Sequence, residues 1–104
     1  MSSPAAHVAL IGNGRVLLSH ATCEQHLRGA QAAVLMQREG QVYLVPLAGP
    51  SPGGMLLKQR NAQGDRVLQA TDFLSAYGLG PLAAERAFEL TWVELAGALR
   101  IEGL

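Results

Sequence analysis

The sequence predicts a β-rich α+β fold, in which antiparallel hairpins form a curled sheet or small open barrel with one or two short helices. Three observations support this class: paired β-prone apolar stretches joined by short polar turns, two short helical stretches between them, and 49% apolar against 15% charged residues. A chain of 104 residues has room for one core. We therefore expect a flexible tail over residues 1–6 and a single domain over residues 7–104.

Four hairpins are predicted from these paired stretches. They join 8–11 with 16–19, 32–37 with 42–47, 55–61 with 66–69, and 88–94 with 99–102. The first turn contains Asn13-Gly14, the pair that best tolerates the two positive φ angles of a type I′ turn. Pro46 has no N–H to donate to a ladder, so its strand is expected to end there or to lie on an edge.

The fourth hairpin has two interpretations. Alternation places Phe88, Leu90 and Trp92 on one face, which is typical of a half-buried strand. A helix over 84–96 also fits, because several of the same apolar residues recur at helical spacing. The β-branched residues on either side of Trp92 favour the strand.

Two short helices are predicted between the hairpins. The first has Thr22 as its N-cap, with Gln25 completing a capping box, and continues to about Gln31. The second has Thr71 as its N-cap and ends at Gly78 in a Schellman motif. The loop over 48–54 is rich in glycine and proline and is a candidate hinge or lid.

His20, Cys23 and His26 form the densest group of reactive side chains. Cys23 and His26 are three residues apart and share a helix face, so these residues, with Glu24, are candidate metal ligands. The same thiol would be a reactive group if a helix start and a protonated histidine lowered its pKa. The alternative is a helix start with surface histidines and a half-buried cysteine. A single cysteine allows no intramolecular disulfide.

Lys58, Arg60 and Arg66 form a predicted basic patch beside Gly53 and Gly54. Cations and glycine backbone amides are groups that bind phosphates, nucleotides or carboxylates. The glycines match no phosphate-binding motif, because no Gly-Lys-Ser/Thr follows them. The alternative is an exposed hairpin whose charges keep a sheet edge from pairing with other chains.

The predicted function is a non-enzymatic protein–protein interaction module that acts as a homodimer or binds another protein. We find no catalytic constellation and expect no cofactor. Eight basic and eight acidic residues give zero net charge, which argues against a nucleic-acid partner and favours self-association. The basic residues concentrate in 1–70 and the acidic ones in 71–104. The N-terminus lacks a signal-peptide pattern and no apolar run is long enough for a membrane span, so we expect a cytoplasmic protein.

Overall fold

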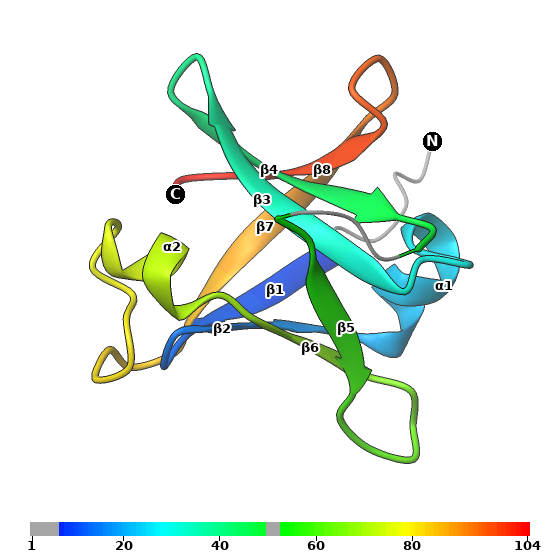
Figure 1. The fold of residues 1–104 in the computed structure, drawn as a ribbon, viewed down its shortest axis with the longest axis horizontal. Coiled ribbons are helices and arrows are strands. Elements are labelled where there is room, and N and C mark those ends of the chain that lie inside the picture. Colours follow the sequence, from blue (N-terminus) through cyan, green and yellow to red (C-terminus); the bar gives the residue numbers. More distant parts are fainter. Residues whose placement is uncertain (1–6, 50–52) are drawn as a thin grey trace, which may run out of the picture.

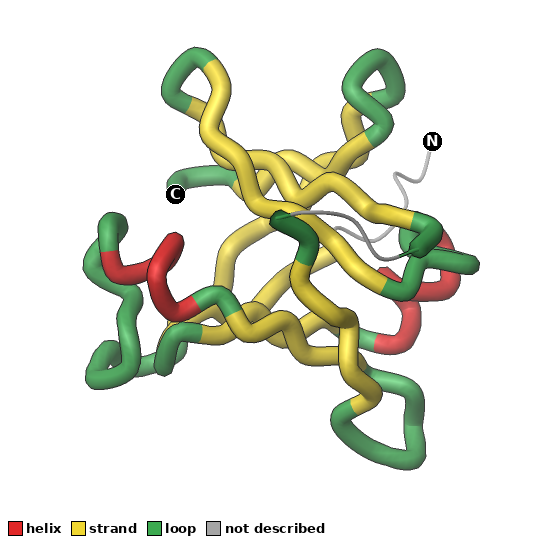
Figure 2. Tube along the Cα trace, viewed as in Figure 1, coloured by secondary structure: helices red, strands yellow, loops and turns green. Residues whose placement is uncertain are grey.

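The structure is a computed structural model that describes residues 7–49 and 53–104. Its eight strands form one closed barrel, with two short helices outside the ring of strands (Figures 1 and 2). The elements are β1 (His7–Gly12), β2 (Arg15–Leu18), α1 (His20–His26), β3 (Ala32–Arg38), β4 (Gln41–Leu47), β5 (Met55–Gln59), β6 (Arg66–Gln69), α2 (Thr71–Ser75), β7 (Arg86–Val93) and β8 (Ala98–Ile101). The β-rich prediction is confirmed, and the ring is closed where the sequence suggested a curled sheet or an open barrel.

The order of strands around the barrel is β1-β2-β6-β5-β3-β4-β8-β7, and all neighbours are antiparallel. This order repeats after four strands: β1–β2 lies opposite β3–β4, and β5–β6 lies opposite β7–β8. The two halves meet along seams of unequal length. Among the described residues, the β1–β7 seam contains five residue pairs, whereas the β3–β5 seam contains two, Ala32 with Leu56 and Ala33 with Met55.

Local turn chemistry explains the first two hairpins. Asn13 and Gly14 have φ angles of 52° and 69°, as a type I′ turn requires. Glu39 and Gly40 adopt the same pair of positive angles, 52° and 77°. Pro46 lies in β4 opposite Ala33, beyond Leu44, where the pairing of β4 with β8 ends. Pro46 therefore occupies the part of β4 that has a free edge, as its missing donor demands.

The barrel interior is aliphatic because alternate residues of each strand point inward. The largest fully buried side chains include Ile11, Leu18, Leu44, Leu68, Leu99 and Ile101. In β7, Phe88 and Leu90 are buried while Glu89 is exposed. The alternation in the fourth hairpin is thus that of a strand, and the helical alternative over 84–96 is wrong.

Helix α1 begins earlier and ends earlier than predicted. Its N-cap is Ser19, whose Oγ accepts a hydrogen bond from the Thr22 backbone N–H at 3.2 Å. The prediction that Thr22 caps the helix is therefore wrong. Thr22 is fully buried, and its hydroxyl bonds to Ser19 Oγ and to the His7 ring. The helix ends at His26, well before Gln31.

Helix α2 begins at Thr71, and the N-cap position belongs to Ala70, which makes no side-chain cap. Thr71 is therefore the first residue of the helix and not its cap. The predicted C-terminal motif is confirmed: Leu79 N–H donates to Leu74 O at 2.9 Å and Gly78 N–H donates to Ser75 O at 3.1 Å. These bonds form a Schellman motif with Gly78 at a φ of 74°.

The two helices lie on opposite sides of the barrel (Figure 1). Leu74 of α2 is fully buried in the core, and Cys23 is a buried residue of α1. No helix in the described part of the chain is long and apolar enough to cross a membrane. The predicted tail over 1–6 and residues 50–52 of the predicted lid lie outside the described residues.

Candidate functional site

His20 lies against the turn between β5 and β6. Its backbone N–H donates to Asp65 Oδ1 at 2.8 Å, and its ring packs so closely on Gly64 that a Cβ there would lie 2.4 Å from Nδ1. Two hydrogen bonds to the carboxylate, from Asn61 and from the His20 backbone, lower the pKa of Asp65. The first turn of α1 is thereby fixed to the β5–β6 turn.

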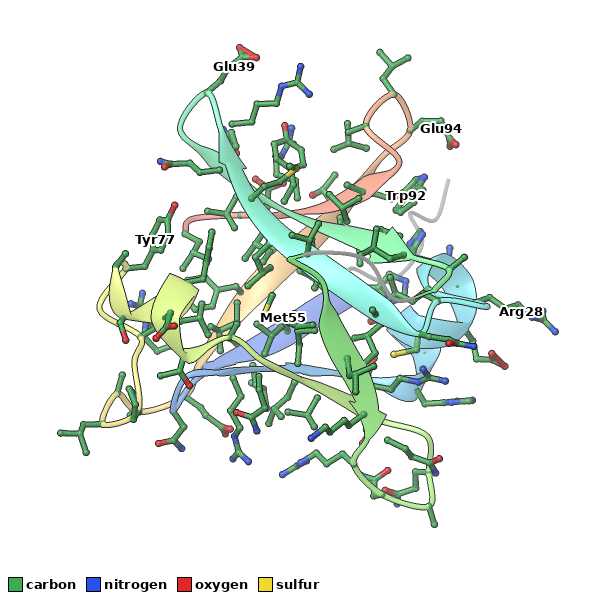
Figure 3. The ribbon with its side chains drawn as sticks, viewed as in Figure 1. Arg28, Glu39, Met55, Tyr77, Trp92 and Glu94 are labelled. Atoms are coloured by element: carbon green, nitrogen blue, oxygen red, sulfur yellow. The ribbon has the colours of Figure 1, made fainter. Side chains whose placement is uncertain are left out.

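His26 belongs to a different cluster on the same helix. Its ring stacks on Trp92, with centroids 5.0 Å apart and 12° between planes, and meets the His7 ring edge-on at 5.2 Å. Partial burial, and then the neighbouring His7, lower the pKa of His26, although Glu94 opposes this. Glu94 Oε1 also accepts a hydrogen bond from Trp92 Nε1 at 3.3 Å, and both residues are labelled in Figure 3.

The structure therefore divides the predicted group of three reactive residues. His20 and Cys23 face the β5–β6 turn, whereas His26 faces His7 and Trp92. Among residues 7–49 and 53–104, no three His, Cys, Asp or Glu side chains are placed to hold a metal ion. Burial raises the pKa of the Cys23 thiol, and this effect outweighs the opposing influence of Arg66. The geometry thus favours a neutral thiol over a reactive thiolate.

The predicted basic patch is also divided. Lys58 pairs with Val67, so both point to the outer face of the barrel, while the next residue, Arg66, points to the opposite face. Arg66 Nη1 donates to Ala30 O at 3.2 Å. Arg60 follows the end of β5 and lines a surface hollow with Asp65. Leu17, which pairs with Val67, lines the same hollow, so Arg60 lies on the outer side of the hairpin with Lys58.

Gly53 and Gly54 lie at the other end of β5 from Arg60. A strand rises about 3.3 Å per residue, so the length of β5 separates these glycines from the cations beyond it. Gly53 has a φ of 81°, with open space where a side chain would be. The structure consequently brings Arg66 of the predicted basic patch together with His20 and Cys23 of the predicted reactive group, and leaves Lys58, Gly53 and Gly54 apart from them.

Sequence reasoning missed one apolar hollow in the described part of the chain. The β3–β4 and β7–β8 turns project on the same side of the barrel, with Glu39 and Glu94 at their tips (Figure 3). Between them lies a cleft of about 420 Å³, which we call the hairpin cleft. It is lined by Met36, Arg38, Glu39, Tyr43, Val45, Val93, Leu95, Ala96 and Ala98.

The lining of the hairpin cleft is apolar or aromatic except for Arg38 and Glu39 on its rim. Met36 is 45% exposed, and Leu95, at the tip of the β7–β8 turn, is 103% exposed. Alternation along β3 and β4 marks Met36 and Tyr43 as outward-facing, but sequence alone does not place the two hairpins beside each other. Comparison with known protein families, curated proteins and solved structures finds no match for the chain.

Proposed function

We propose that this protein is a non-enzymatic interaction module and that it forms a homodimer through the hairpin cleft. The observation that carries the proposal is an apolar cleft of about 420 Å³ with a fully exposed leucine, Leu95, on its lip. Its volume lies within the range of about 300–1,000 Å³ typical of ligand sites. A large apolar side chain in water beside an apolar hollow is a feature of surfaces that bind another protein.

A second copy of the chain is the occupant that best fits the cleft. A two-fold interface uses the same patch on both subunits, so the patch must be complementary to itself. The hairpin cleft meets this condition, because each copy offers a knob, Leu95, and a hollow lined by Met36, Tyr43 and Val45. The charges on the rim of the cleft are also complementary between copies, because Arg38 on one copy can face Glu39 or Glu94 on the other. Zero net charge adds no long-range repulsion between copies.

Light scattering during size-exclusion chromatography tests this proposal at micromolar concentrations. We expect the unchanged chain to be a dimer. Leu95→Glu should raise the dissociation constant of the dimer roughly tenfold or more, because a carboxylate would be buried in an apolar contact. The matched control is Leu82→Glu. Leu82 is equally exposed, at 101%, but it lies in the loop before β7, outside the cleft lining.

Three results would refute the proposal. The first is a monomer at every concentration for the unchanged chain. The second is a dimer that Leu95→Glu leaves intact, and the third is a dimer that Leu82→Glu disrupts to the same degree. Both leucines lie in water, so neither change alters core packing, and circular dichroism should show that both variants retain the fold.

A further inference from the structure

We propose that the chain holds a second site, a pocket between α1 and the β5–β6 turn that binds a small monocarboxylate through Arg66. We call it the α1 pocket, and its volume is about 170 Å³. Drug-sized ligands occupy roughly 300 Å³ or more, so this pocket fits a molecule of only a few heavy atoms. It lies away from the hairpin cleft and does not depend on the proposed dimer.

The walls of the α1 pocket are fixed in place by contacts at three points. The His20 backbone N–H binds Asp65 Oδ1 at 2.8 Å, and the His20 ring rests on Gly64, where any side chain would collide with it. On the other side, Arg66 Nη1 binds Ala30 O at 3.2 Å. Because these contacts join α1, the β5–β6 turn and the segment before β3, the pocket is formed before a ligand arrives. A preformed pocket reduces the entropic cost of binding.

Arg66 supplies the anion-binding group. Within the described ranges, the bond to Ala30 is the one hydrogen bond that its side chain makes, which leaves most of its five donors available. The planar guanidinium matches the two oxygens of a carboxylate. Arg28 also lines the pocket, and Glu24 opposes the two arginines. The Asp65 carboxylate also acts on Cys23, so two carboxylates balance the two arginines. This balance disfavours a phosphate monoester, which carries about −1.5 to −2, relative to a monoanion that Arg66 alone can pair.

The rest of the lining suits a short apolar group on the ligand. Leu27 and the buried Cys23 form the inner part of the pocket. Burial raises the pKa of the Cys23 thiol, so it is neutral and acts as a small apolar surface. Gln59 also lines the pocket, and its amide nitrogen is already bound to Asn61 O at 2.7 Å. An acetate-like ligand would place its carboxylate on Arg66 and its methyl group against Cys23.

Cys23 is the single cysteine, so its alkylation rate reports on the α1 pocket. The folded chain is treated with iodoacetamide at alkaline pH, and modification is followed by intact mass. We expect acetate to slow the reaction, with half-protection at about millimolar concentration, relative to chloride at equal ionic strength. Protection by phosphate equal to that by acetate would refute the assigned ligand class. Protection by neither anion, or no alkylation of the folded chain, would refute the site.

A second arm tests Arg66 itself by comparing iodoacetate with iodoacetamide, which have nearly the same shape but differ in charge. We expect Arg66→Gln to lower the ratio of the iodoacetate rate to the iodoacetamide rate at least about threefold. The anionic reagent loses the cation that attracts it, whereas the neutral reagent does not. Lys58→Gln is the matched control, since it removes one charge from the outer face of the same hairpin. An equal fall in this rate ratio for Arg66→Gln and Lys58→Gln would overturn the role of Arg66. The acetate protection of the unchanged chain decides the site even if Arg66→Gln fails to fold.

Discussion

His26 and Trp92 stack almost in parallel, with 12° between their planes and 5.0 Å between their centroids. Burial and His7 lower the pKa of His26, so its ring is neutral at pH 7. We expect the fluorescence of Trp92, the single tryptophan, to be constant above pH 6.5, the ordinary value for His26. It should fall at lower pH, as an imidazolium forms on the indole face and quenches it. A pH titration of the emission measures this.

His26→Gln should remove the transition, and His7→Gln should shift it to higher pH because the neighbour that lowers the pKa of His26 is removed. The stability of the fold follows the same titration. The pKa of His26 is lower in the folded chain than in the unfolded chain. The contribution of His26 to the free energy of unfolding is therefore complete above pH 6.5 and is lost as the pH falls toward the lower pKa of the folded state. An unchanged transition in His26→Gln would assign the signal to another group.

Ser19→Ala should destabilise the chain by about 1 kcal/mol, because the Thr22 N–H at the start of α1 loses its acceptor. Thr71→Ala should change stability by less than about 0.5 kcal/mol, because Thr71 is exposed and caps no helix. Urea denaturation curves of the two variants compare them directly. A larger loss for Thr71→Ala would contradict the cap assignments.

Gly12→Ala should destabilise the chain by roughly 1–3 kcal/mol through overpacking. A Cβ at Gly12 would lie 2.5 Å from Ala84 O and 2.6 Å from Glu85 Cα, and backbone atoms cannot turn away as a side chain can. Gly49→Ala is the control, since no atom of the described residues lies within 4 Å of its added Cβ. Thermal denaturation should separate the two variants, and equal melting temperatures would contradict the close approach.

Hydrogen exchange should be uneven around the barrel. The β3–β5 seam has two residue pairs and the β1–β7 seam has five. Opening the β3–β5 seam therefore breaks fewer contacts and costs less free energy. We expect the Leu57 amide, which donates to Gln31 O at 3.0 Å, to exchange faster than amides across the β1–β7 seam. Equal protection, measured by NMR, would show that the barrel opens only as a whole.

The hairpins could be predicted from sequence because their information is local. Asn13-Gly14 specifies its own turn, and the alternation of Phe88 and Leu90 specifies the buried face of β7. Closure of the barrel was not predictable in the same way, since it depends on pairing β1 with β7 and β3 with β5, strands far apart in the chain. The N-cap of α1 was misassigned because Thr22 resembles a cap in sequence, whereas its hydroxyl is bound to His7 in the core.

The candidate sites were predicted in part. His20, Cys23 and Arg66 were each identified, but their convergence depends on the docking of α1 onto the β5–β6 turn. Lys58 and Arg66 were grouped because they are close in sequence, yet the pairing of Lys58 with Val67 sends them to opposite faces. The hairpin cleft was missed because it lies between two hairpins that only the completed ring brings together.

Each strand of the barrel has a partner on both sides, and this limits how the protein can aggregate. An incoming chain finds no strand that is unpaired along a whole edge, so fibrils of the cross-β type should grow most readily from molecules that have first opened. The two-pair seam between β3 and β5 is the place where opening disturbs the fewest contacts. A disulfide engineered across that seam should therefore delay fibril formation in agitated solutions, while leaving association through side chains unchanged.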